Sequence, residues 1–225
     1  MIPPPYPRIP HLIGGRGSRD DLVLTDREVD SLLHDQVVVE EKLDGANVTV
    51  FSDGTGLPQI ALRGGTDSAD RAGQRGPLRA WAAANLSVLE DVLVQWPVIY
   101  GEWMLLTHAV AYDHLPSYFV ALDLWRGGDG FASPSQRDQA CRNAGLVTPP
   151  EVWTGSPRTV DTIEDLLPQS AWGSSVAEGI VVRRVGSGTP RLAKLVRKGF
   201  ARVSDEEWRR GRPHNQLAGG RASWR

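Results

Sequence analysis

Lysine is scarce in this sequence, and cysteine is nearly absent. Only Lys42, Lys194 and Lys198 are lysines among its 225 residues, so arginine supplies the other 22 of the 25 basic residues. Arginine keeps its proton in proteins and cannot act as an amine nucleophile, whereas lysine can. We therefore interpret the three lysines as candidates for chemistry. The single cysteine, Cys141, excludes an internal disulfide and predicts a reducing compartment, with the cytoplasm as the expected location.

Long apolar runs and a strong net charge are also missing. No run approaches the roughly 20 apolar residues of a membrane span, so we expect no membrane partner. The net charge of −2 is unlike that of a typical nucleic-acid binder. From Arg191 to Arg225, however, ten basic residues stand against three acidic ones. This end of the chain indicates either a polyanion partner or a solvated arginine-rich tail.

Strand patterns outnumber helix patterns along the chain. Alternating or β-branched runs predict strands at residues 37–43, 47–51, 59–63, 98–104, 118–125, 179–185 and 192–196. Capping boxes and helical spacing predict helices at residues 25–34, 78–93, 133–143 and 204–208. Most neighbouring strands can pair as hairpins, the first of them across an Asp44-Gly45 turn. We therefore predict an α+β fold in which antiparallel β-sheets are flanked by helices.

The length of the chain predicts a single domain spanning residues 1–225. Residues 1–20 are rich in proline, glycine and arginine, so we expect an irregular lead-in there. Residues 201–225 predict a basic C-terminal helix and tail.

Lys42 lies at the end of a predicted strand, where alternation puts it on the opposite face from Val39, Glu41 and Leu43. A lysine in this place could attack a phosphorus or a carbonyl. It would first have to lose a proton, so burial or nearby positive charge would have to lower its pKa from about 10.4. A divalent metal bound to phosphates would provide that charge. The alternative is a turn lysine paired with Asp44.

Two carboxylates interrupt predicted strands that are otherwise apolar. They are Glu102 and Glu178. A carboxylate inside a buried strand is costly unless something pairs with it. Two such acids on separate strands indicate a shared polar site, although an internal cation such as Arg183 is a competing explanation.

Five segments follow one another in a fixed order: Lys42-Leu43-Asp44-Gly45, Tyr100-Gly101-Glu102-Trp103, Tyr118 to Asp123, Glu178 to Arg183, and Lys194 to Arg197. In this order they resemble motifs I, III, IIIa, IV and V of the covalent nucleotidyltransferase superfamily, which contains DNA ligases, RNA ligases and mRNA capping enzymes. Asn47 and the segment from His108 to Phe119 make the chain most similar to ATP-dependent RNA ligases of the RNA ligase 2 type. The resemblance implies the adenylylation domain of nucleic-acid ligases without a C-terminal OB-fold domain.

The resemblance also implies a role for each matching residue. Lys42 would attack ATP, with Mg²⁺ or Mn²⁺ as the metal cofactor, and Lys194 would hold the α-phosphate. Glu178 would bind the metal, and Glu102 would accept a hydrogen bond from the ribose hydroxyls. The remaining contacts would come from Glu41 at the adenine edge, Phe119 stacked on the adenine, Asp44 and Asn47 in the phosphate and metal region, and Arg63 on the 5′-phosphate of the acceptor strand.

Two of these assignments have alternatives. Phe119 lies in an apolar run and could be an ordinary core residue, with Tyr118 facing the base instead. Motif V usually has two basic residues at alternate positions of one strand, and here Val196 takes the second place. Arg197 or Lys198 is then the candidate for the missing charge.

The resemblance therefore implies an ATP-dependent RNA ligase that joins 5′-phosphate and 3′-hydroxyl ends of nucleic acid, with RNA favoured, through a lysyl-AMP intermediate. A DNA ligase or a capping-type nucleotidyltransferase would share the first step. A nucleotide- or RNA-binding module that has lost its chemistry is a further alternative. Because few residues follow the last motif, an accessory chain could also supply a missing domain.

Overall fold

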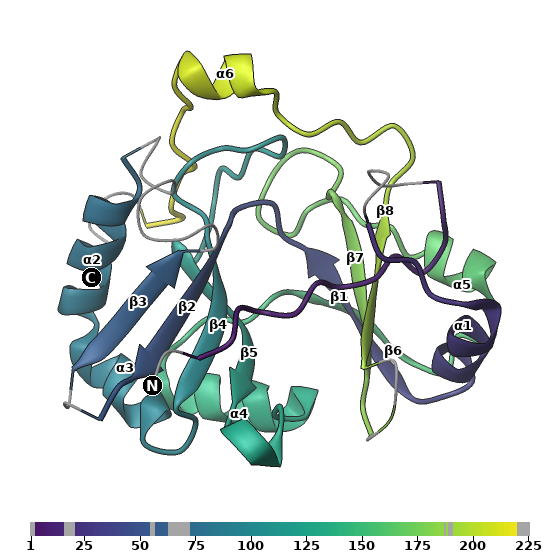
Figure 1. Ribbon diagram of the computed structural model, residues 1–225. Coiled ribbons are helices and arrows are strands. Elements are labelled where there is room, and N and C mark those ends of the chain that lie inside the picture. Colours follow the sequence, from purple (N-terminus) through teal and green to yellow (C-terminus); the bar gives the residue numbers. More distant parts are fainter. Residues whose placement is uncertain are drawn as a thin grey trace. The chain divides into compact units, whose positions relative to one another are not determined.

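The computed structural model describes residues 3–15, 21–54, 57–62, 73–186, 188 and 191–219. The chain forms two compact units. The first unit consists of Met1–Tyr6, Asp44–Thr148 and Val203–Arg225, and the second consists of Pro7–Leu43 and Pro149–Arg202. Each unit contains one four-stranded antiparallel sheet (Figure 1). The description of residues 1–225 as one nucleotidyltransferase domain stays a prediction.

The sheet of the second unit has the strand order β6-β1-β7-β8. Its strands are β1 (Val37–Lys42), β6 (Glu151–Gly155), β7 (Gly179–Arg184) and β8 (Leu192–Val196), and its helices are α1 (Asp26–Leu33) and α5 (Val160–Glu164). One face of this sheet is apolar, because Val37, Val39, Ile180 and Leu195 pack with Ile163 of α5 in one buried cluster. Strand alternation places Glu40, Lys42, Arg183 and Lys194 on the other face, whereas Glu41 and Arg184 share the face of the apolar cluster.

The sheet of the first unit has the strand order β3-β2-β4-β5. Its strands are β2 (Ala46–Ser52), β3 (Pro58–Leu62), β4 (Val98–Trp103) and β5 (Phe119–Trp125). The helical segments are α2 (Arg75–Ala84), α3 (Leu86–Leu93), the short 3₁₀ turn η1 (Gly127–Asp129), α4 (Pro134–Ala144) and α6 (Asp205–Arg209). Helices α3 and α4 pack on each other and on the sheet. They cover a core that includes Val48, Trp81, Leu89, Ile99 and Phe119.

The predicted α+β class and the antiparallel sheets are confirmed. The three capping boxes also form, with Thr25, Ser133 and Ser204 as the N-caps of α1, α4 and α6. Strand β6 and helix α5 were not predicted, because both are short and carry no clear periodicity. Among the described residues, no helix has the length and apolar character needed to cross a bilayer.

The prediction of one helix over residues 78–93 is wrong, because the structure has two helices that meet at Asn85. The backbone of Asn85 leaves the helical region at φ −112° and ψ 25°. Its side chain donates from Nδ2 to the Trp81 carbonyl at 2.9 Å, which competes with continued helix formation. The apolar spacing predicted the buried face correctly, and it could not show this break.

The prediction of a hairpin across Asp44-Gly45 is also wrong. Strands β1 and β2 belong to different sheets and to different units. Gly45 does not have a positive φ, so it does not serve a tight turn. A Cβ atom at Gly45 would lie 2.7 Å from the Trp103 carbonyl oxygen and 2.7 Å from Met104 Sδ. Gly45 is therefore required for close approach of the chain to the end of β4.

Replacing Gly45 by alanine should therefore lower the free energy of unfolding by about 1–3 kcal/mol, because a backbone oxygen and a packed sulfur must move. Gly76→Ala is the matched control, since a Cβ atom there meets nothing within 4 Å and the residue lies in α2. That control should leave stability unchanged or raise it by at most about 1 kcal/mol. Urea denaturation of both variants measures the difference. Equal stability of the two variants would contradict the spacing role of Gly45.

Candidate active site

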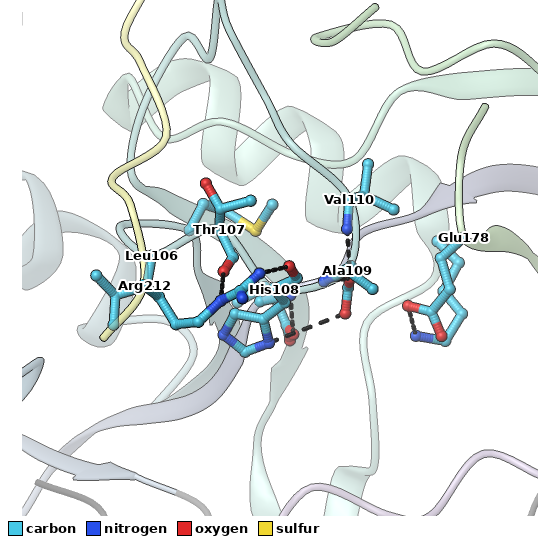
Figure 2. A network of polar contacts seen from close by, with 12 residues as sticks. Leu106, Thr107, His108, Ala109, Val110, Glu178 and Arg212 are labelled. Carbon is cyan, nitrogen blue, oxygen red and sulfur yellow. Dashed lines mark hydrogen bonds and ion pairs between the residues drawn. The ribbon is translucent and has the colours of Figure 1, made fainter. Parts of the chain in front are cut away.

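Lys42 and Glu178 form an ion pair at the end of β1. Lys42 Nζ lies 2.6 Å from Glu178 Oε2, and Figure 2 shows this contact at the Glu178 carboxylate. The side chains are 23% and 6% exposed, respectively, so both charges are largely withdrawn from water. A nearly buried carboxylate needs such a counter-charge. Lys42 therefore contacts an acid from a distant part of the chain.

Strand register explains why these two residues meet. Lys42 is paired with Gly179 of β7, and Glu178 directly precedes that glycine. A Cβ atom at Gly179 would lie 2.1 Å from the Leu195 carbonyl oxygen of β8. Only glycine therefore allows β7 and β8 to approach each other at this point. The Glu178 carbonyl also accepts a hydrogen bond from the Arg197 N–H at 3.0 Å, which fixes the backbone beside the carboxylate.

Lys194 lies on the same face of the sheet as Lys42. Its Nζ is 3.6 Å from Asp21 Oδ1, and its side chain is 12% exposed. Burial lowers the pKa of Lys194, and the charges of Lys42 and Arg202 act in the same direction, whereas Asp21 and Glu178 oppose them. The structure thus brings together three residues predicted from the sequence, namely Lys42, Glu178 and Lys194, within the second unit.

Two other acids of β1 have their own partners. The buried Glu40 accepts a hydrogen bond from Arg183 Nε, so these two residues form an ion pair of their own. Glu41 accepts hydrogen bonds from Ser170 Oγ at 2.7 Å and from the Ala171 N–H at 2.8 Å. Burial raises the pKa of Glu41, and these two bonds oppose that effect. Glu41 thus anchors the 170–171 segment, and its contact with an adenine stays a prediction.

Asp44 holds the segment that follows β4. Its Oδ2 accepts hydrogen bonds from the N–H groups of Ala109 at 2.7 Å and Val110 at 2.9 Å. The Asp44 N–H also donates to the Tyr112 hydroxyl at 3.0 Å. Figure 2 labels the two residues that donate these bonds, Ala109 and Val110. These are the contacts of a structural acceptor, and a catalytic role of Asp44 stays a prediction.

The basic C-terminal segment binds the same part of the first unit. Arg212 donates from Nε to the Thr107 carbonyl at 2.9 Å and from Nη2 to the His108 carbonyl at 2.6 Å, as Figure 2 shows. The buried Asn215 accepts from Thr107 Oγ1 at 2.8 Å and donates to the Met104 carbonyl at 2.7 Å. At least part of this segment therefore makes contacts within the first unit. The sequence alone indicated only a segment that binds a polyanion or one that is exposed to solvent.

Glu102 and Asn47 lie opposite each other on β4 and β2. Glu102 Oε1 accepts a hydrogen bond from the Gly45 N–H at 3.1 Å, and Asn47 Nδ2 donates to the Gly101 carbonyl at 3.4 Å. Both side chains are partly exposed. Contacts within the first unit therefore fix the direction of the Glu102 carboxylate, while its role toward a ribose stays a prediction.

Phe119 packs as a core residue, in agreement with its alternative interpretation. Its ring is fully buried and stacks on Trp81, with centroids 4.6 Å apart. The neighbouring Tyr118 is partly exposed and donates from its hydroxyl to the Asn215 carbonyl at 3.0 Å. Stacking of Phe119 on an adenine has no support in this packing. Arg63 lies outside the described residues, so its phosphate contact stays a prediction.

The second cation expected near Lys194 is not supplied by Lys198 in this structure. Lys198 is 80% exposed and lies 3.8 Å from Glu164 of α5, the helix that packs on the apolar face of the sheet. Arg197 extends over the Phe200 ring, with 5.2 Å between its guanidinium carbon and the ring centroid. The charge of Arg202 acts on Lys194, and the Arg202 guanidinium is 3.8 Å from Asp21. The motif pattern did not include Arg202, because this residue lies well beyond the end of β8.

The donor set around Glu178 fits a metal ion that arrives with a nucleotide. Over the residues that the structure describes, no group of three or more His, Cys, Asp or Glu side chains is arranged to hold a metal by itself. Mg²⁺ is usually bound by one or two carboxylates together with substrate phosphates and water. A single carboxylate such as Glu178 is therefore sufficient for a metal that the phosphates also bind.

Comparisons with known proteins agree with the motif order. The family model described as RNA ligase matches residues 35–196. Similar solved structures are those of Naegleria gruberi RNA ligase. A mutant with ATP and Mn has a TM-score of 0.58 and 14% identity, and the match covers 88% of this chain and 62% of that one. A mutant with AMP and Mn has a TM-score of 0.56, 14% identity and coverages of 86% and 61%, and a form with PPi has a TM-score of 0.55, 15% identity and coverages of 87% and 61%. At these identities the likeness shows the fold. A comparison with curated proteins finds no match.

The present chain spans about three fifths of the length of the Naegleria ligase. The matched family region ends at Val196, within β8, and begins two residues before β1. It therefore contains both sheets and every described residue that the motif order singled out, except Arg197 and Lys198.

Asp44→Ala should lower the free energy of unfolding by about 1–3 kcal/mol, because two backbone N–H groups lose their acceptor. Asp91→Ala is the control, since Asp91 is an exposed acid on α3 and its loss should change stability by no more than about 0.5 kcal/mol. Chemical denaturation measures both. An Asp44→Ala variant as stable as the control would show that the carboxylate is not a structural acceptor.

Proposed function

The chain belongs to the RNA ligase family of nucleotidyltransferases, and we propose that it is an ATP-dependent RNA ligase that joins 5′-phosphate and 3′-hydroxyl ends through a lysyl-AMP intermediate on Lys42. The observation that supports this proposal most is that Lys42, Glu178 and Lys194 lie close together in the second unit, where Lys42 contacts Glu178 and both of their charges act on Lys194. The similar ligase structures contain ATP, AMP, PPi or Mn, which supports ATP and a divalent metal for this chain as well.

In the first step, Lys42 Nζ attacks the α-phosphorus of ATP. A phosphorus–nitrogen bond forms while the bond from that phosphorus to the bridging oxygen of pyrophosphate breaks, and pyrophosphate leaves. The ammonium group must first lose its proton, which passes to water, because Glu178 is the proposed metal ligand and a metal-bound carboxylate is a poor proton acceptor. Lys194 holds the α-phosphate and offsets the charge that develops on its oxygens.

Glu178 is the proposed metal ligand. Its carboxylate is 6% exposed and already faces the cation of Lys42, so the position accommodates positive charge. When bound there, Mg²⁺ or Mn²⁺ would offset the charge of the phosphates and favour the neutral amine of Lys42.

In the remaining steps, the AMP passes from Lys42 to the 5′-phosphate of a strand, which forms a phosphoanhydride. The 3′-hydroxyl of the other strand then attacks that 5′-phosphate, and AMP leaves as the phosphodiester forms. We propose Arg63 for the 5′-phosphate, Glu102 for the ribose and Asn47 for the phosphate region, because these residues match the family motifs. The greater length of the similar ligases keeps an accessory chain or domain in the proposal.

Labelled ATP and Mg²⁺ should transfer label to the wild-type protein, and Lys42→Ala should reduce that label to background. Lys198→Ala is the matched control, because this lysine is 80% exposed and lies beside Glu164, so its loss should change the labelling rate less than about twofold. Denaturing gels measure the label. An unlabelled wild-type chain, or a Lys42→Ala variant that labels normally, would contradict the proposal.

A panel of nicked duplexes should show faster sealing of RNA than of DNA strands. Each duplex carries a 5′-phosphate and a 3′-hydroxyl at the nick, and ATP is the only nucleotide supplied. Faster sealing of an all-DNA nick would identify a DNA ligase instead. Transfer of label from GTP in preference to ATP would identify a capping-type enzyme.

A further inference from the structure

The backbone of Lys194 is held on its outer side by the N-terminal segment. The Lys194 N–H donates to the Pro10 carbonyl at 2.9 Å, and the Lys194 carbonyl accepts from the Leu12 N–H at 2.8 Å. These two bonds make His11 the parallel bridge partner of Lys194. Strand β8 is the last strand in the sheet order, so this short segment covers its edge at the position of the lysine.

A second extended segment holds His11 from the other side. The His11 N–H donates to the Leu22 carbonyl at 2.6 Å, and the His11 carbonyl accepts from the Leu24 N–H at 2.9 Å. His11 is 2% exposed. Residues 3–15 form no helix or strand, and the irregular lead-in expected over residues 1–20 stays a prediction, but isolated bridges hold His11 to Val23 and to Lys194 of β8. Lys194, its bridge partner on β8, lies far along the chain, so local sequence patterns could not predict this bridge.

Asp21 connects the side chains of His11 and Lys194. Its Oδ2 lies 3.2 Å from His11 Nε2, and its Oδ1 lies 3.6 Å from Lys194 Nζ. The three side chains are 3%, 19% and 12% exposed for His11, Asp21 and Lys194, so solvent screens their charges less than those of a surface pair. Arg202 approaches the same carboxylate at 3.8 Å, but its side chain is 70% exposed.

This arrangement can fix the direction of a flexible amine. A lysine side chain has a flexible four-carbon stem, and its amine keeps one direction only when a contact holds it. Burial lowers the pKa of His11, and the charge of Lys194 acts in the same direction, so the imidazole favours its neutral form. A neutral His11 can donate from Nε2 to Asp21 and orient that carboxylate without competing with Lys194 for its charge.

We propose that Asp21 and His11 are positioning residues for Lys194, with Asp21 holding the amine toward the α-phosphate and His11 holding Asp21. The inference rests on the proposed function, because it concerns the step in which Lys194 contacts the nucleotide. Both residues precede residue 35, where the match to the family model begins. The contacts around Lys194 in this chain therefore carry the inference, and the family motifs do not.

Single-turnover labelling of the full chain with ATP and Mg²⁺ tests the proposal. Asp21→Asn should slow lysyl-AMP formation at saturating ATP by about 10- to 100-fold, because a displaced charge no longer meets the phosphate. The apparent KM for ATP and the unfolding temperature should change little. Glu164→Gln is the matched control, since Glu164 also contacts a lysine at 3.8 Å in the same unit, and it should stay within about twofold of wild type.

A double-mutant cycle with Lys194→Ala separates positioning from general structural damage. If Asp21 acts through Lys194, adding Asp21→Asn to Lys194→Ala should slow labelling by less than about twofold. Asp21→Glu keeps the charge one methylene farther out and should label at a rate between those of wild type and Asp21→Asn. This variant decides the question if Asp21→Asn lacks a cooperative unfolding transition, and wild-type labelling by Asp21→Glu would then overturn the proposal.

The possible failures are distinguishable. A wild-type chain that labels normally, together with an Asp21→Asn variant that labels as fast as Glu164→Gln, overturns the positioning role and leaves the proposed function standing. If Asp21→Asn slows labelling by the same factor in the wild-type and Lys194→Ala backgrounds, the positioning role is also overturned and the proposed function still stands. A wild-type chain that takes no label overturns the proposed function, and the positioning role with it.

Discussion

The register between β1 and β7 is the constraint on which the polar face of the second unit depends. It sets Lys42 opposite Gly179 and so brings the lysine beside Glu178. A shift by one residue would turn Lys42 toward the apolar cluster around Ile180 and Leu195, where a charge has no partner. The apolar packing on one face therefore fixes the lysine on the other.

The polar face of this sheet distributes its charges among separate counter-ions. Lys42 has Glu178, Lys194 has Asp21, and Arg183 has Glu40. This separation suits chemistry in which one lysine must become neutral and attack while another must remain charged and hold a phosphate. The two lysines still influence each other, because the charge of Lys42 lowers the pKa of Lys194, but the nearest acid of each is a different residue.

Local sequence patterns predicted most strands and the capped helices, because alternation and capping boxes reflect interactions between near neighbours. The scarcity of lysine in an arginine-rich chain likewise pointed to Lys42 and Lys194. These local patterns could not predict which strands belong to the same sheet. Asp44-Gly45 has the composition of a hairpin turn, yet Gly45 is needed for space beside Trp103. The same limit applies to His11, whose partner on β8 lies far along the chain.

In the first unit, a residue at a motif position does not always make the contact that the motif implies. Asp44 and Phe119 stand at motif positions, but one accepts backbone hydrogen bonds from Ala109 and Val110 and the other packs on Trp81. The central claim therefore depends on Lys42. Digestion of the full chain after incubation with ATP and Mg²⁺, followed by mass spectrometry of the peptides, tests it most directly. We expect one AMP per chain, joined to the amine of Lys42, and AMP on Lys194, on Lys198 or on no lysine would rule out Lys42 as the nucleophile.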